Sequence, residues 1–420
     1  MEKIIVRGGK ELHGEVDISV AKNSVLPIIV ATILNPTEII LKKVPMLEDV
    51  TVLINLLREL NCKVQFSSIT GDLKINTQNL KEVDPNSELI RKMRASFLIM
   101  GPMLARFGKC KISMPGGCNI GSRPVDLHLK GFNALGIESE VGYGYVEAKI
   151  DKLHGNRIYL DFPSVGATEN IMMAAVLAPG VTVIENAAEE PEIWDLARFL
   201  NCMGANIEGA GYGKITIHGV SELKQPKPFT PIFDRIEAGT FMVAAGITNS
   251  KITINGVNEE HLMPTIEKLK ECGVYCTIDG QKMIVDGTKE KRPVDIKTMP
   301  YPGFPTDMQA QMMALLAITK GVSVITETVF ENRFMHVGEL GRMGANIKID
   351  GRIAIVEGVT TLTGCGVKAT DLRAGAAMIL AGLVANGQTE IGEIYHIDRG
   401  YTNIEEKFRK LGAEIYRVHK

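Results

Sequence analysis

A glycine-rich segment carries the residues of this chain that are best suited to chemistry. It reads Pro115-Gly-Gly-Cys-Asn-Ile-Gly-Ser-Arg-Pro124 and holds Cys118 and Arg123 among three glycines and two prolines. It lacks the Gly-Lys-Ser/Thr ending of a phosphate-binding P-loop, and no GxGxxG motif opens the chain. An arginine five residues from a thiol in a glycine loop is a reasonable setting for a reactive cysteine. By spacing alone, a working thiol and an incidental loop cysteine remain equally open.

Ionisable residues at the starts of apolar helical segments form a second set of candidates. Helix N-termini present unpaired N–H groups and a partial positive charge, which suit phosphate or carboxylate groups. The residues at such starts are Lys22 (followed by Asn23), Arg94, Asp307, Asp371 and Arg373. Each acid could instead be an N-cap or first-turn residue, and each base could be an ordinary surface charge. Together they suggest one shared cleft. Arg399 could join it, although alone it could simply pair with Asp398.

The elements that must position these residues recur with a period of about 70 residues. An amphipathic helix ends in a Gly-containing step and is followed at once by a β-like stretch. The step falls at Asn61, Gly136, Gly204, Gly273, Gly344 and Gly412. Glycine suits this place because a helix C-terminus favours a residue that tolerates positive φ, and asparagine is the next best choice.

Apolar helices rich in alanine and methionine repeat with the same period. They begin near Lys22, Arg94, Ala167, Ala238, Asp307 and Leu372. Because they are apolar nearly all round, each should be buried inside a domain. A β-branched strand follows each of them, at residues 37–41, 108–112, 181–184, 251–254, 322–325 and 389–391.

These patterns predict an α/β fold of six helix–strand–helix–strand units. The similarity of residues 4–12 to residues 215–223, three periods later, favours two lobes of three units. We expect one lobe at 21–229 with the Cys118 segment, a second at 1–20 plus 230–420, and an active site in the cleft between them. Helices buried inside strands would make each lobe an inside-out α/β barrel, the reverse of a TIM barrel. A solenoid is the alternative.

Bulk properties narrow the function classes. The 420 residues are 45% hydrophobic and carry a formal net charge of −2, which gives no basic field for nucleic acid. The first ten residues lack the zones of a signal peptide, and no apolar run approaches a membrane span. The seven cysteines form no CxxC pair and read as reduced cytosolic thiols, six of them packing residues. His128, His336 and His396 suggest neither a triad nor a metal site, so we expect structural histidines and no cofactor.

Long strings of residues resemble those of the UDP-N-acetylglucosamine 1-carboxyvinyltransferases, also called enolpyruvyl-UDP-GlcNAc synthases, in the EPSP synthase superfamily. The resemblance runs the whole length of the chain. The strings are Ala21-Lys-Asn23, Met93-Arg-Ala-Ser96, residues 115–128, Ser164-Val-Gly-Ala167, residues 304–311, residues 327–334, Asp371-Leu-Arg373 and residues 396–401.

The resemblance implies a cytoplasmic enzyme of bacterial peptidoglycan synthesis that is the target of fosfomycin. It would transfer the enolpyruvyl group of phosphoenolpyruvate to the 3-hydroxyl of UDP-N-acetylglucosamine and release phosphate. Cys118 would protonate the methylene carbon and could form a covalent adduct with phosphoenolpyruvate. Asp307 would accept the proton of the sugar hydroxyl, and Asp371 would assist proton transfer or stabilise the cationic centre.

The same resemblance implies the binding residues. Those for phosphoenolpyruvate would be Lys22, Asn23, Arg123, Arg373 and Arg399, with Lys22 and Arg399 also catalytic. Those for UDP-N-acetylglucosamine would be Arg94, Arg123, Pro124, Val125, Asp126, Leu127, Ser164, Val165, Gly166, Asp307 and Val329. The chain departs from some members at Phe162, where they have lysine, and at Glu48, where they have a basic residue. We expect a monomer or weak oligomer that binds neither nucleic acid nor membrane.

Two rival functions remain. A 3-phosphoshikimate 1-carboxyvinyltransferase would share the architecture, but the Cys118 segment and the Arg123-Pro-Val-Asp-Leu127 string count against it. A non-catalytic nucleotide-sugar-binding paralogue would need no proton donor, so the retained Cys118 counts against that possibility.

Overall fold

The protein folds into two compact units, each with its own hydrophobic core. The structure, a computed structural model, describes residues 2–81, 89, 94–114 and 125–419, with Arg94 described by its backbone alone. The described residues between 20 and 232 form what we call the N-terminal unit, and residues 2–19 and 233–419 form the C-terminal unit. The chain therefore passes from one unit to the other after Ser19 and again after Ile232.

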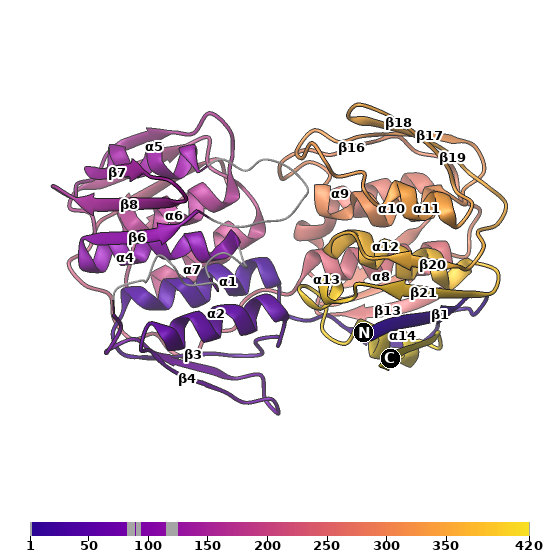
Figure 1. Cartoon of the computed structure of the whole chain (residues 1–420), viewed down its shortest axis with the longest axis horizontal. Helices are drawn as coiled ribbons and strands as arrows, with labels where there is room; N and C mark the ends of the chain where they lie inside the picture. The colour runs from indigo at the N-terminus through magenta and orange to yellow at the C-terminus, as the bar shows by residue number, and fades with distance from the viewer. Residues whose placement is uncertain (1, 82–88, 90–93, 115–124, 420) are drawn as a thin grey trace. The chain divides into compact units, whose positions relative to one another are not determined.

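Three small sheets belong to the described part of the N-terminal unit (Figure 1). In their spatial order the strands are β3 (Glu38–Leu41), β5 (Leu73–Asn76) and β4 (Lys63–Phe66); β6 (Lys109–Ser113), β8 (Tyr145–Ile150) and β7 (Ile137–Val141); and β11 (Asn206–Glu208), β12 (Lys214–His218), β10 (Val181–Glu185) and β9 (Arg157–Tyr159). The helices are α1 (Lys22–Ala31), η1 (Thr32–Leu34), α2 (Glu48–Glu59), η2 (Arg94–Ile99), α4 (Met100–Phe107), α5 (Asp126–Ala134), α6 (Val165–Ala175) and α7 (Pro191–Cys202).

The C-terminal unit also has three sheets in its described residues, and each of these has four strands. Their orders are β20 (Gly366–Lys368), β21 (Gln388–Gly392), β1 (Glu2–Arg7) and β22 (Glu414–His419); β14 (Tyr275–Asp279), β15 (Lys282–Asp286), β13 (Lys251–Asn255) and β2 (Glu15–Asp17); and β16 (Ile296–Lys297), β17 (Val322–Thr326), β19 (Ile353–Glu357) and β18 (Asn346–Asp350). Its helices are α8 (Arg235–Ile247), α9 (Glu259–Cys272), η3 (Thr306–Met308), α10 (Gln309–Leu316), α11 (Val337–Arg342), α12 (Leu372–Val384), α13 (Tyr395–Asp398) and α14 (Ile404–Lys410).

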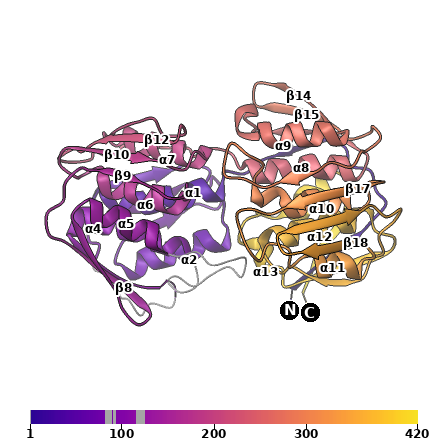
Figure 2. The same ribbon diagram turned by 90° about the horizontal axis from the view of Figure 1, so that it is seen from above.

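Helices that are apolar on nearly every side fill the interior of the C-terminal unit. In α10 every residue is buried, and in α8 every residue after Arg235 is buried. These two helices and α12 pack on one another, and Figure 2 shows them side by side. Small side chains allow this approach, because α8 and α12 are built mainly from alanine, glycine and aliphatic residues. The predicted burial of these apolar helices is confirmed. Two of the candidate charges lie at their starts, because Asp307 is in η3 directly before α10 and Arg373 is the second residue of α12.

The ends of the amphipathic helices follow the sequence expectation closely. Asn61 and the glycines at 136, 204, 273, 344 and 412 all adopt positive φ, between 67° and 98°. Gly273, for example, caps α9 in the left-handed region, and its N–H donates to the carbonyl of Lys270. The predicted apolar helix near Arg94 differs in detail, because residues 94–99 form the 3₁₀ turn η2 before α4 begins.

No helix in the described ranges combines the length and the apolar character needed to cross a membrane.

Candidate active site

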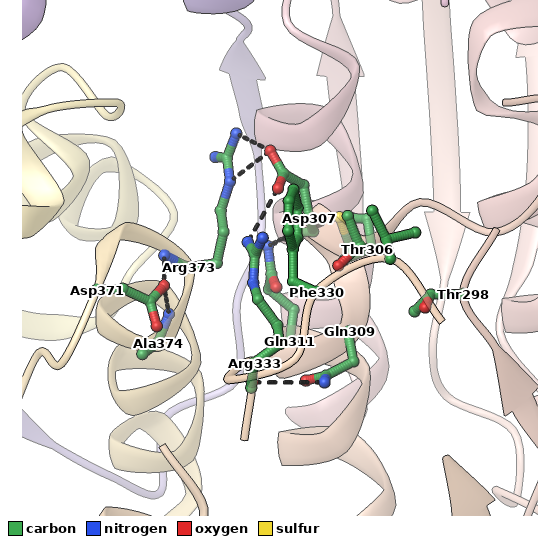
Figure 3. A network of polar contacts seen from close by, with 12 residues as sticks. Thr298, Thr306, Asp307, Gln309, Gln311, Phe330, Arg333, Asp371, Arg373 and Ala374 are labelled. Carbon is green, nitrogen blue, oxygen red and sulfur yellow. Dashed lines mark hydrogen bonds and ion pairs between the residues drawn. The ribbon is translucent and has the colours of Figure 1, made fainter. Parts of the chain in front are cut away.

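Asp307 lies between two buried arginines in the C-terminal unit (Figure 3). Nη2 of Arg333 is 2.9 Å from Oδ1 of Asp307, and Nε and Nη2 of Arg373 are 3.2 and 2.9 Å from Oδ2. Asp307 comes from η3 at the start of α10, Arg333 from the segment between β17 and α11, and Arg373 from the first turn of α12. The side chains of both arginines are at most 5% exposed, whereas that of Asp307 is 26% exposed. The carboxylate is therefore the accessible member of the cluster.

The two guanidinium groups fix the charge of Asp307. Burial alone would raise the pKa of this carboxyl group, but Arg373 and Arg333 outweigh burial and hold the pKa of Asp307 well below its usual range. Burial alone would lower the pKa of Arg373, but the attraction of Asp307, together with smaller contributions from Tyr401 and Asp234, outweighs burial and raises it. Asp307 is thus an anion with two cationic partners, able to accept a hydrogen bond but weakly basic.

Three neutral side chains, those of Gln311, Tyr401 and Thr240, lie next to this cluster. Nε2 of Gln311 donates to the backbone carbonyl of Asp307 at 2.8 Å. The hydroxyls of Tyr401 and Thr240 lie 2.9 Å apart, and the guanidinium carbon of Arg373 lies 5.4 Å from the centre of the Tyr401 ring. Burial raises the pKa of Tyr401, so this hydroxyl keeps its proton. The position of Arg373 is therefore set by α8, α10 and the segment after α13 together.

Asp371 caps the helix that carries Arg373. Its Oδ1 accepts hydrogen bonds from the N–H groups of Arg373 and Ala374, at 2.8 and 3.1 Å (Figure 3). The N-cap interpretation thus applies to Asp371, but not to Asp307, whose side chain makes no cap bond. Buried His336 has no hydrogen-bond partner for either ring nitrogen among the described residues. Burial and the charge of Arg333 lower its pKa to about 4 against the opposing charge of Asp371, so His336 is neutral near pH 7.

The other two candidates of this unit occupy turns. Arg399 immediately follows α13, and its neighbour Asp398 binds Arg417 through both oxygens, at 2.6 and 3.0 Å. The carboxylate of Asp398 is therefore committed to Arg417. Val329 follows β17, and its N–H donates to Oε1 of Glu327 at 2.9 Å.

In the N-terminal unit, Lys22 begins α1 and forms an ion pair with Asp49. The distance from Nζ of Lys22 to Oδ2 of Asp49, in the first turn of α2, is 2.7 Å. Asn23, next along the helix, is exposed. Buried Asp195 on α7 fixes this end of α1, because one of its oxygens accepts from the Ser24 hydroxyl and from the N–H of Ile232.

The predicted nucleotide-sugar residues of this unit lie at two further helix starts. Ser164 is the N-cap of α6, which Val165 and Gly166 begin, and Val125 precedes Asp126 and Leu127 at the start of α5. His128 joins the two helices: its Nδ1 lies 3.1 Å from Nδ2 of Asn170 on α6, and its ring packs edge-on against Phe97. These contacts give His128 the structural role expected for it. Phe162, one of the two departures, is exposed just before α6.

Cys118, Arg123 and Pro124 lie outside the described residues. The other six cysteines are all free. Burial raises the pKa of Cys62 to about 11 and that of Cys110 to about 12, as expected for packing residues. Cys202, at the end of α7, is exposed, so the expectation that all six are packing residues is wrong at this position.

Sequence reasoning missed Arg333, Tyr401 and Glu327. Arg333 and Glu327 lie in a loop, where no periodicity separates a buried polar side chain from an exposed one. Both occur in the string of residues 327–334, and a closely spaced glutamate, asparagine and arginine among aromatic residues was the one available signal.

Comparison with known proteins shows the family to which the chain belongs. A family model described as EPSP synthase (3-phosphoshikimate 1-carboxyvinyltransferase) matches residues 6–408. UDP-N-acetylglucosamine 1-carboxyvinyltransferase 2 of Clostridium tetani is 65% identical over 418 residues, 100% of both chains. UDP-N-acetylglucosamine 1-carboxyvinyltransferase 1 of Clostridium perfringens is 59% identical over 422 residues, again 100% of both. The chain belongs to the UDP-N-acetylglucosamine 1-carboxyvinyltransferase family.

Solved structures show that this family member shares its fold with other enolpyruvyl transferases. The enolpyruvyl transferase NikO from Streptomyces tendae superposes with a TM-score of 0.88 at 24% identity, covering 99% of each chain. EPSP synthase from Acinetobacter baumannii gives a TM-score of 0.76 at 18% identity over 100% of each. At such identities the likeness concerns the fold alone. The mixed α/β fold expected of a UDP-N-acetylglucosamine 1-carboxyvinyltransferase is therefore confirmed.

Proposed function

We propose that the protein transfers the enolpyruvyl group of phosphoenolpyruvate to the 3-hydroxyl of UDP-N-acetylglucosamine, with release of phosphate, as the first committed step of peptidoglycan synthesis. The observation that carries the proposal is the 65% identity over the full chain to an enzyme of that name. The reaction is an addition followed by an elimination. A proton is added to the methylene carbon, the hydroxyl oxygen bonds to the neighbouring carbon, and a methyl proton and phosphate then leave.

We assign the proton donor to Cys118, on the strength of the sequence resemblance. A thiol can donate its proton to the methylene carbon, and the thiolate left behind can take a methyl proton back during elimination. The same sulfur can be trapped as a covalent adduct with phosphoenolpyruvate.

Asp307 is our candidate acceptor for the proton of the sugar hydroxyl. A weakly basic carboxylate is sufficient for this step, and a strong base is not needed. Once the methylene carbon is protonated, the attacked centre is oxocarbenium-like, and the hydroxyl becomes strongly acidic as its oxygen bonds to that centre. An ionised carboxylate can hold the hydroxyl by a charge-assisted hydrogen bond and accept the proton late. A substrate carboxylate that competes for Arg373 would also make Asp307 more basic, because one of its two cationic partners would be shared.

Anion binding would be divided among the charged helix starts. We propose that Arg373 faces the carboxylate of phosphoenolpyruvate, and that Lys22, Arg123 and Arg399 hold its phosphate beside Asn23. The nucleotide sugar would be bound by Arg94, by residues 123–127 and 164–166, and by Val329. Asp371, whose Oδ1 is committed to the cap of α12, would act through its charge on the developing cation.

The finer architecture is also part of the proposal. We propose that six repeats of about 70 residues build the two units as inside-out α/β barrels. Three sheets among the described residues of each unit, and the positive-φ residues at a common spacing, support this division. We further propose a cytoplasmic monomer or weak oligomer, since the proposed chemistry uses a free thiol and two soluble metabolites.

Turnover with alternative acceptors tests the function. Phosphate release from phosphoenolpyruvate is measured with UDP-N-acetylglucosamine or with shikimate 3-phosphate as acceptor. We expect release with the nucleotide sugar and its loss in Cys118→Ala. Preference for shikimate 3-phosphate would replace this assignment by the related transferase, and no release with either acceptor would indicate a non-catalytic binding protein.

A further inference from the structure

Glu327 is a buried carboxylate that joins three separate segments of the C-terminal unit. It is 1% exposed and directly follows β17. Its Oε1 accepts hydrogen bonds from the hydroxyl of Thr298 at 2.8 Å and from the N–H groups of Val329 and Phe330 at 2.9 and 3.1 Å. Its Oε2 accepts from the hydroxyl of Thr306 at 2.9 Å.

Four donors are what a buried carboxylate needs to offset the loss of its hydration. No apolar side chain could replace Glu327 without leaving two backbone N–H groups and two hydroxyls without this acceptor. These four hydrogen bonds therefore hold three chain segments together at Glu327.

Two of these segments converge on Asp307. Thr306 is the residue before Asp307, so its bond to Oε2 fixes the turn that presents the carboxylate. Phe330 leads to Arg333, whose guanidinium carbon lies 5.5 Å from the Phe330 ring and whose Nη2 binds Oδ1 of Asp307. Glu327 is thus connected to Asp307 in two ways. One is through Thr306, the residue before Asp307, and the other is through the segment that carries Arg333. Figure 3 shows Thr298, Thr306 and Phe330 around this cluster.

We propose that Glu327 is a positioning residue for the nucleotide-sugar acceptor, acting through Thr306 on Asp307. The inference rests on the proposed function, in which Asp307 receives the proton of the sugar hydroxyl. It assigns Glu327 no contact with either substrate. A disturbed Glu327 should affect the acceptor more than phosphoenolpyruvate.

Two threonines provide a matched pair of test variants. Thr306→Val cuts the bond that leads to Asp307. Thr298→Val cuts an equally short bond to Glu327 and also removes the acceptor of the Thr328 N–H, at 2.9 Å, but it leads away from Asp307. If Glu327 served stability alone, Thr298→Val would be the more harmful change.

Steady-state kinetics of the full-length enzyme separate the two roles. For Thr306→Val we expect KM for UDP-N-acetylglucosamine to rise roughly tenfold, the effect of one charge-assisted hydrogen bond. KM for phosphoenolpyruvate should change by less than about twofold, and Thr298→Val should change both constants by less than about twofold while lowering Tm. Equal effects of the two variants on the acceptor KM would overturn the inference, as would a larger effect of Thr298→Val.

Substitution of Glu327 itself gives a second measurement. Glu327→Gln keeps the size and one accepting oxygen, whereas Glu327→Ala keeps neither. For kcat/KM of the acceptor we expect the order wild type, Gln, Ala, with Gln recovering part of the loss. An alanine variant with lower Tm but an unchanged acceptor KM would leave only a structural role. Wild-type protein without turnover would instead overturn the proposed function, and this inference with it.

Discussion

The Nε and Nη2 atoms of Arg373 both donate to Oδ2 of Asp307, at 3.2 and 2.9 Å. Arg333 takes Oδ1, so each carboxylate oxygen has its own guanidinium partner. This arrangement explains why a carboxylate proposed to receive a proton is weakly basic in the free protein. The two arginines together therefore control the charge of Asp307 and the orientation of its carboxylate.

Removing one arginine should raise the pKa of Asp307 enough for its ionisation to affect the pH dependence of activity. Arg373 and Arg333 together hold the pKa of Asp307 low, so the wild-type kcat/KM for the acceptor should show no acid limb from this group at pH 5 to 8. In Arg333→Gln the pKa of Asp307 rises, and activity should fall as the pH drops toward it. Arg342→Gln, which alters an exposed ion pair in the same unit, is the matched control. Identical pH profiles for wild type and Arg333→Gln would contradict this account.

The same ion cluster predicts how stability depends on Asp307. Asp307→Asn removes the carboxylate that two buried guanidinium groups share, and breaking a buried pair in this way costs about 3–5 kcal/mol of unfolding free energy. Because the folded-state pKa of Asp307 is depressed, its contribution is present above the unfolded pKa and lost as pH falls through the folded value. The stability gap between wild type and Asp307→Asn, measured by urea unfolding, should therefore persist from pH 8 to pH 5. A gap that closes by pH 6 would exclude such a depressed pKa.

Much of this molecule follows from its sequence. Positive φ at Asn61 and Gly273 is dictated by local backbone sterics, and α10 is buried because all of its residues except two glutamines are apolar. The convergence of Asp307 with Arg373 could be anticipated because both start apolar helices of one unit. Arg333 and Glu327 could not, since their partners are set by where a loop folds back in three dimensions. Nor could the sequence tell that Asp371, but not Asp307, would cap its helix.

The thiol at position 118 gives a test that needs only the sequence assignment. Cys118→Ala should abolish phosphate release, whereas Cys118→Asp should stay active, because a carboxylic acid can also donate a proton. Cys118→Asp should also resist thiol-alkylating epoxides such as fosfomycin. The control is Cys202→Ser, since Cys202 is an exposed thiol: this variant should remain active and epoxide-sensitive. An inactive Cys118→Asp would count against the acid role.

Asp195 offers a prediction for the N-terminal unit. Its carboxylate accepts a hydrogen bond from the hydroxyl of Ser24, which directly follows Lys22 and Asn23 in α1. Ser24→Ala removes only that bond. We expect KM for phosphoenolpyruvate to rise about three- to tenfold, because the start of α1 is less firmly held. KM for the nucleotide sugar should stay near the wild-type value. Thr32→Ala, which removes a hydroxyl bond at the far end of the same helix, is the control. Equal KM changes in both variants would show general loosening of the helix instead.

A buried glutamate on α6 predicts a pH dependence of stability with the opposite sign from Asp307. Burial, together with the charges of Glu192 and Glu190, raises the pKa of Glu169 well above its usual range. The folded chain therefore keeps this proton after the unfolded chain has lost it near pH 4.3. Stability from this group is complete below that pH and declines as pH rises toward the folded pKa. Glu169→Gln, which cannot ionise, should accordingly gain Tm over wild type at pH 8 but not at pH 4.5. Glu208→Gln, at an exposed position on β11, should show the same small difference at both pH values, and the same result for Glu169→Gln would show that Glu169 is ionised in the folded protein.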